Sequence, residues 1–165
     1  MPEDLFESFE YSCNYLSSAM ESVSIVGSKD SILGEHAFTN NIYLNEVQIE
    51  SIRRIDNYAF EGCIELREFI LPRGLESVGS NIFNGCTRLS KLYIGTSLIE
   101  TTFDFMSTYF DYLQSQIRDV TILSGVTNIG DAAFSDCIQL TSVELPNSLE
   151  SIGNSGFQNC ERRSE

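Results

Sequence analysis

Apolar and polar positions along the chain repeat with a period of about 23 residues. An aromatic residue and a cysteine three positions later mark the copies AFEGCIEL (59–66), IFNGCTRL (82–89) and AFSDCIQL (133–140). GFQNC (156–160) is a partial copy, and a weaker copy that begins at Ala37 has Asn41 in place of the cysteine. A fixed period of this length indicates a solenoid of stacked units, here called rungs, because one short unit cannot bury its own apolar side.

Each copy continues with two apolar residues that flank a single free position. These pairs stand nine and eleven residues after the aromatic residue: Val47 and Ile49, Phe69 and Leu71, Leu92 and Ile94, Val143 and Leu145. Alternation with a period of two predicts a very short strand whose flanking residues face the core. Pro72 and Pro146 stop two of these strands, and Gly79, Gly130 and Gly153 indicate turns further along the rung. One strand, one turn and one compact segment are therefore predicted for each rung.

Two further segments have the spacing of a helix face. Phe103, Met106, Phe110, Leu113 and Ile117 are spaced 3, 4, 3 and 4 residues apart, which predicts a helical rung over about 101–117. The same spacing relates Phe6, Phe9, Cys13, Leu16 and Met20. A strand pair follows each of these segments, Val120 with Ile122 and Val23 with Ile25. We therefore predict a single domain over 1–165, with an N-terminal helical cap (1–21), repeats (22–160) and a charged tail (161–165).

The segment NIGDAAFSDCIQLTSVELPNSLESIG (128–153), with SIGNSGFQNC (151–160), resembles the BspA-type leucine-rich repeat. The resemblance covers roughly residues 33–160, apart from one interruption at the helical rung. It implies an α/β repeat fold, namely a right-handed leucine-rich-repeat solenoid with short parallel strands on its concave side. It also implies a non-catalytic protein-binding role in a surface or secreted, adhesin-like protein. The implied partner is a host or extracellular-matrix protein.

The charge balance narrows the range of partners. The chain has 24 acidic and 10 basic residues and a net charge of −14, which argues against nucleic acid or an anionic membrane surface as the partner. No apolar run is long enough to insert into a membrane, and the acidic start lacks the basic and apolar regions of a secretory signal. A chain complete as given would be cytoplasmic, whereas the family resemblance favours the cell surface or secretion.

The cysteines and the single histidine do not form a known catalytic or metal motif. Cys63, Cys86, Cys137 and Cys160 recur because the rung recurs, without the paired spacing of metal ligands. A disulfide between adjacent rungs fits the ~4.8 Å spacing of neighbouring strands, but five cysteines leave one unpaired, and we predict buried free thiols. His36 is expected at the surface of its rung. No cofactor, no metal site and no enzymatic activity are predicted.

The solvent side of the predicted strands is the candidate binding face, because strand side chains alternate between core and solvent. Ile70 and Tyr93 should lie side by side there, with Arg67, Lys91 and Arg118 nearby, and aromatic and arginine anchors are favoured in protein interfaces. The candidate residues are Gln48, Arg67, Glu68, Ile70, Lys91, Tyr93, Arg118, Thr121 and Glu144. The alternative is a solvated face without a ligand, as in a structural spacer or an intracellular scaffold.

Overall fold

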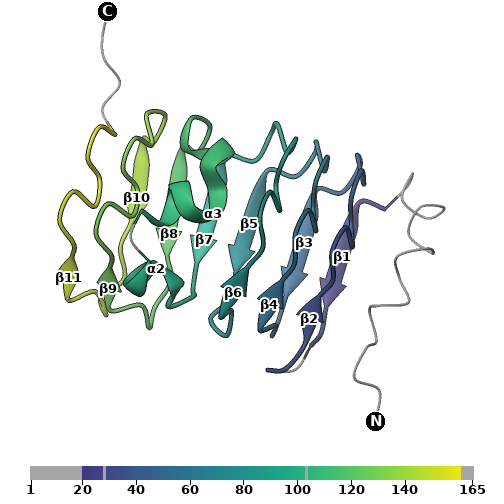
Figure 1. Ribbon diagram of the computed structural model, residues 1–165, viewed down its shortest axis with the longest axis horizontal. Coiled ribbons are helices and arrows are strands. Elements are labelled where there is room, and N and C mark those ends of the chain that lie inside the picture. The colour runs from purple at the N-terminus through teal and green to yellow at the C-terminus, as the bar shows by residue number, and fades with distance from the viewer. Residues whose placement is uncertain (1–19, 28, 103, 161–165) are drawn as a thin grey trace, which may run out of the picture.

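The computed structural model describes residues 20–27, 29–102 and 104–160, and over these residues the chain forms a repeat solenoid of parallel strands (Figure 1). The six longer strands stand where the apolar pairs predict them, so the predicted fold class is confirmed. They are β1 (Ser22–Ile25), β3 (Glu46–Ile49), β5 (Glu68–Leu71), β7 (Lys91–Ile94), β8 (Asp119–Ile122) and β10 (Ser142–Glu144). The expected cap helix and charged tail lie outside the described residues, apart from Met20 and Glu21, and the proposed division into cap, repeats and tail stays a prediction.

The concave side consists of two hydrogen-bonded ladders. β1 pairs with β3, and β5, β7, β8 and β10 form a four-stranded parallel sheet. β3 lies next to β5, but no ladder joins them. The break falls where the step between equivalent residues, Val47 and Phe69, is 22 residues, whereas Phe69 and Leu92 are 23 residues apart and pair in register.

A second line of strands runs along the edge where the sequence predicts only a turn. β2 (Ile32–Leu33), β4 (Arg54–Ile55) and β6 (Ser77–Val78) form one ladder, and β9 (Asn128–Ile129) pairs with β11 (Ser151–Ile152). Between these ladders stands α2 (Leu98–Thr101), and the Ile99 carbonyl accepts a hydrogen bond from Gly130 N at 2.8 Å. In the strand rungs, Gly79 N and Gly153 N make the same bond to the rung before them. A short helix therefore replaces one strand without interrupting the stack.

The compact segments reverse the chain with two left-handed residues four positions apart. These pairs are His36 and Asn40, Tyr58 and Gly62, Asn81 and Gly85, Ala132 and Asp136, and Ser155 and Asn159. Glycine, asparagine and aspartate tolerate this conformation, which suits the second position of each pair. The segments also bond to one another, as Phe60 N donates to Ile82 O at 2.9 Å and Phe134 N to Gly156 O at 2.8 Å. These bonds add a third line of hydrogen bonds between rungs.

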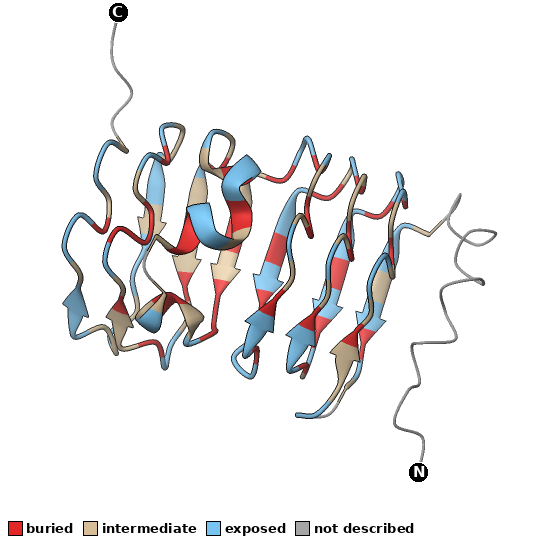
Figure 2. Cartoon of the chain, viewed as in Figure 1, coloured by how far each residue is buried: buried red, intermediate tan, exposed pale blue. Residues whose placement is uncertain are grey.

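Aromatic rings stack through the core from rung to rung. The ring centroid of Phe60 lies 5.4 Å from that of Phe38 and 6.0 Å from that of Phe83. Phe134 stacks on Phe157 at 5.1 Å in the C-terminal rungs. Figure 2 shows the resulting pattern along the strands, in which buried positions alternate with exposed ones.

The helical rung contains a helix that is shorter than the rung and kinked. α3 spans Phe105–Gln114, and the Asp104 carboxylate caps it by accepting a hydrogen bond from Ser107 N at 3.4 Å. Phe110 departs from helical geometry with φ −139° and kinks the helix, while its ring joins the aromatic stack 5.8 Å from Phe83. α3 therefore lies within the helical rung predicted over about 101–117, and Ile117, beyond the end of the helix, is buried.

The last described rung does not bury its apolar pair as predicted. Val143 is half-buried and Leu145 is 47% exposed, whereas the equivalent residues of β5, Phe69 and Leu71, are buried. The reason is that no described strand lies beyond β10 to cover them. Ile152 on β11 is 45% exposed for the same reason.

Candidate protein-binding face

Most of the candidate residues lie on the four-stranded ladder. The concave face is here the solvent side of the six longer strands. The register pairs Ile70 with Tyr93 and Tyr93 with Thr121, and Thr121 with Glu144. Glu68 and Lys91 form a second row two residues earlier. Gln48 stands apart from these, on β3 in the other ladder, where it donates a hydrogen bond to Glu46 at 2.7 Å.

The centre of the face combines an aliphatic residue, an aromatic ring and a cation. Ile70 is 38% exposed and lies beside Tyr93 in the register of the sheet. The Lys91 ammonium lies 4.7 Å from the centroid of the neighbouring Tyr93 ring, within the range of a cation–π interaction. A side-chain hydrogen bond with Tyr93 raises the pKa of Lys91, and the charges of Glu68 and Glu144 act in the same direction. Lys91 therefore stays protonated, and its contact holds the Tyr93 ring beside Ile70.

A polar region adjoins this centre towards β10. Thr121 donates a hydrogen bond from its hydroxyl to the Glu144 carboxylate at 3.3 Å. The two residues are 23 positions apart, which is one repeat, so the stacking of adjacent rungs brings them together. The face thus runs from apolar and aromatic at β5 and β7 to polar and acidic at β8 and β10.

Arg67 and Arg118 lie at the start of the strands, in a groove of about 800 Å³. Each directly precedes a strand, Arg67 before β5 and Arg118 before β8, and Ser90 lies between them in the stack. Ser90 N donates to Arg67 O at 3.0 Å, and Arg118 N donates to Ser90 O at 2.8 Å. Because Gln139, from the rung of β10, also lines the groove, the groove crosses four consecutive rungs.

The other residues of this groove were not predicted from the sequence. They come from the turns that precede the strands and are all polar or charged: Thr87, Arg88, Ser115, Gln116 and Gln139. Gln116 is fixed by hydrogen bonds from its amide to the carbonyls of Cys86, at 2.8 Å, and Leu89. A sequence signal for the groove lies two residues before Leu66, Leu89, Ile117 and Leu140. Thr87 and Ser115 are polar at this position, where the outer rungs have Ile64 and Ile138.

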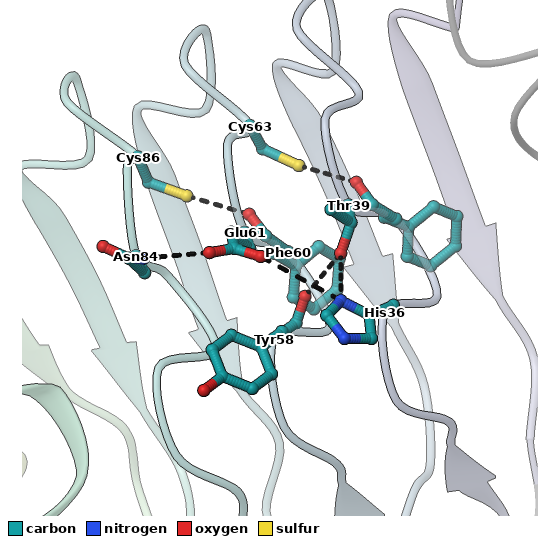
Figure 3. Close-up of polar contacts among 9 residues, drawn as sticks. His36, Thr39, Tyr58, Phe60, Glu61, Cys63, Asn84 and Cys86 are labelled. Carbon is teal, nitrogen blue, oxygen red and sulfur yellow. Dashed lines mark hydrogen bonds and ion pairs between the residues drawn. The ribbon is translucent and has the colours of Figure 1, made fainter.

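Cys63, Cys86 and Cys137 are buried and Cys160 is half-buried. Figure 3 shows two of these thiols, Cys63 and Cys86, each pointing to the preceding rung. The Cys63 thiol donates to Phe38 O at 3.2 Å, the Cys86 thiol to Phe60 O at 3.1 Å and the Cys160 thiol to Phe134 O at 3.0 Å. Burial raises the pKa of Cys86 and of Cys137 to about 12, and that of Cys63 well above its ordinary value. The four described cysteines are free thiols, and burial favours the protonated form of Cys63, Cys86 and Cys137 at neutral pH.

His36 has surface contacts that do not resemble a catalytic arrangement. Its ring stacks on Tyr58, with centroids 5.0 Å apart and planes within 6°, and Nδ1 lies 3.1 Å from the Thr39 hydroxyl (Figure 3). The Glu61 carboxylate is 4.0 Å away, and the histidine side chain is 48% exposed. These contacts link two adjacent rungs at the surface.

The described residues contain neither a candidate metal cluster nor a candidate membrane-spanning helix. Residues 20–27, 29–102 and 104–160 contain no group of three or more histidine, cysteine, aspartate or glutamate side chains placed to hold a metal ion. Within the same part of the chain, no helix combines the length and the apolar character needed to cross a membrane.

Comparison with solved structures relates the solenoid to bacterial leucine-rich-repeat proteins. A leucine-rich-repeat protein of T. pallidum is 25% identical with a TM-score of 0.50, over 86% of this chain and 64% of that one. A leucine-rich-repeat protein of Eubacterium ventriosum is 18% identical with a TM-score of 0.51, over 86% of this chain and 44% of that one. The chain thus spans less than two thirds of either protein. Comparison with curated proteins gives no match.

The repeat itself matches a family model. Six copies of the BspA type leucine rich repeat region cover residues 7–110 and 104–164. This match includes the aromatic, cysteine and strand positions that form the stacked rungs described above. The chain therefore belongs to the BspA-type leucine-rich-repeat family.

Proposed function

We propose that the chain is a non-catalytic protein-binding module and that the centre of its concave face contacts the partner. Family membership supports the general role, because leucine-rich-repeat domains commonly bind proteins. The observation that carries the proposal is the pairing of Ile70 with Tyr93 across β5 and β7 at the solvent side of the sheet. An apolar centre beside a cation, with a polar rim, is the composition of protein interfaces.

We further propose that the chain is part of a surface or secreted, adhesin-like protein. This role rests on the resemblance to BspA-type proteins, and the partner we propose is a host or extracellular-matrix protein. The net charge of −14 suits this kind of partner better than nucleic acid, because a strongly acidic surface repels polyanions.

Purified extracellular-matrix proteins, immobilised one by one, provide the probes for the test. Wild-type protein is expected to bind at least one of them. The double variant Ile70→Ser, Tyr93→Ser should bind about thirtyfold more weakly, the effect of losing a hot spot worth ~2 kcal/mol. Its fold should be retained, because both side chains lie on the solvent side of their strands.

A matched control removes an aliphatic and an aromatic side chain elsewhere. Ile42 is 40% exposed and Tyr112 is 57% exposed, and both lie off the concave face. The variant Ile42→Ser, Tyr112→Ser should bind like the wild type. Equal binding by the two double variants would move the site off the concave face, and a wild type that binds no matrix protein would contradict the adhesin role.

A further inference from the structure

We propose that the groove between the rungs of Arg67 and Arg118 binds an acidic segment of a protein partner, with one carboxylate at each arginine. This inference rests on the proposed protein-binding function for the nature of the partner. It adds the charge and spacing of the segment that is recognised.

The groove concentrates positive charge on a strongly acidic chain. Three of the ten basic residues, Arg67, Arg88 and Arg118, line it, and no carboxylate does. Arg88 is already paired with Glu65, which lies one rung away. The side chains of Arg67 and Arg118 are exposed and make no hydrogen bond or ion pair with any of the described residues. These two guanidinium groups are therefore available to a ligand.

Guanidinium groups select carboxylates by geometry as well as by charge. Their planar arrangement of donors matches the two oxygens of a carboxylate in a bidentate pair. Arg67 and Arg118 are separated by the Ser90 rung, which places their backbones about 10 Å apart at ~4.8 Å per rung. The Ser90 hydroxyl has no partner among the described residues and lies between the two sites. The groove thus fits two carboxylates about 10 Å apart.

The surroundings of the groove favour a short peptide over a long polyanion. Ile64, in the rung of Arg67, and Ile138, in the rung that follows Arg118, occupy equivalent positions at the two ends of the groove and are 39% and 45% exposed. A peptide can place apolar side chains on these residues, whereas a sulfated polysaccharide has none to offer. A polyanion that extends beyond the groove also meets the remaining acidic surface, and screening reduces that repulsion only beyond about 8 Å at physiological ionic strength.

A peptide designed from these distances provides the probe. In the acetylated, fluorescent hexapeptide Leu-Glu-Pro-Pro-Glu-Leu, the polyproline II conformation separates the glutamates by about 9 Å. The comparison peptide is Leu-Gln-Pro-Pro-Gln-Leu. Wild-type protein should bind the glutamate peptide at least about tenfold more tightly than the glutamine peptide, and added salt should weaken that binding.

Matched variants locate the binding site. Arg67→Gln with Arg118→Gln should lose at least about tenfold in affinity for the glutamate peptide. Arg53→Gln with Lys29→Gln makes the same change in net charge, at exposed positions away from the groove, and should bind like the wild type. Any of three results would overturn the inference. The wild type binds both peptides equally, the wild type binds neither peptide, or the arginine double variant binds the glutamate peptide as tightly as the wild type does. A heparin hexasaccharide that binds more tightly, with the same arginine dependence, would assign the groove to a polysaccharide instead.

The same variants separate this inference from the proposed function. Ile70→Ser with Tyr93→Ser leaves the lining of the groove intact, so it should retain peptide binding while losing matrix-protein binding. Peptide binding without any matrix-protein binding would contradict the adhesin role and leave the groove assignment standing.

Discussion

Replacing Phe60 by alanine tests the aromatic stack on which the solenoid core depends. The side chain is fully buried, and its ring centroid lies 5.4 Å from Phe38, 6.0 Å from Phe83 and 5.0 Å from Phe69. Truncating a buried phenylalanine costs about 3–5 kcal/mol, and each ring pair adds about 0.5–1.5 kcal/mol beyond area burial. The truncation range already includes the loss of such ring contacts, so with three ring partners we expect Phe60→Ala to lower the free energy of unfolding by about 4–5 kcal/mol, the upper part of that range.

Urea denaturation followed by far-UV circular dichroism measures this loss. Phe60→Leu keeps most of the side-chain volume and should lower the free energy of unfolding by less than about 1.5 kcal/mol. Tyr112→Ala, on the exposed side of α3, should leave the free energy of unfolding within about 0.5 kcal/mol of the wild-type value. Phe134→Ala, with Phe157 as its ring partner, should cost about 3–5 kcal/mol. A Phe60→Ala protein as stable as the Tyr112→Ala control would refute the stacked core.

Three further predictions concern the position of the recurrent cysteine. Under non-reducing conditions, alkylating reagents should react slowly with Cys63, Cys86 and Cys137 of the native protein. The unfolded protein should show five reactive thiols. If two or four of these thiols are missing, the protein contains disulfides. Because burial raises the pKa of Cys86 and Cys137 from 9.0 to about 12, their contribution to stability should be complete below about pH 9 and decline as the pH rises towards 12. The variant Cys86→Ala, Cys137→Ala should therefore lose stability less steeply across that range, and an identical slope would exclude this titration. Asn41 occupies the cysteine position, and its buried Oδ1 has no hydrogen-bond partner among the described residues. Asn41→Cys should therefore stabilise the protein by about 1 kcal/mol, as measured by urea denaturation. A loss of stability in this variant would show that Oδ1 is satisfied.

The longer strands could be predicted because two apolar residues with a period of two mark the position of each one in the sequence. Val47 with Ile49 and Leu92 with Ile94 show this alternation directly. The two-residue strands have one buried side chain at most, such as Ile55 in β4, so no alternation exists to reveal them. The kink at Phe110 was equally hidden, because the stacking of its ring on Phe83 imposes a tertiary constraint on a segment with helical spacing.

Part of the candidate site could likewise be predicted from the sequence, and part of it could not. Residues on the strands, such as Ile70 and Tyr93, follow from the register once the period is known. The groove depends on turn residues, and Gln116 reaches it only because α3 ends at Gln114 and the chain returns across the preceding rung. That return is a property of the helical rung's packing, which the 23-residue period does not describe.

Amide chemical-shift mapping tests most directly whether the concave face binds protein. Isotope-labelled protein would be titrated with the matrix protein that binds it in the immobilised panel. We predict the largest shifts and line broadening at 67–71, 91–94 and 118–122, centred on Ile70 and Tyr93. Changes concentrated instead on the compact segments at 58–62 and 81–85, with the strands unaffected, would contradict the proposed function.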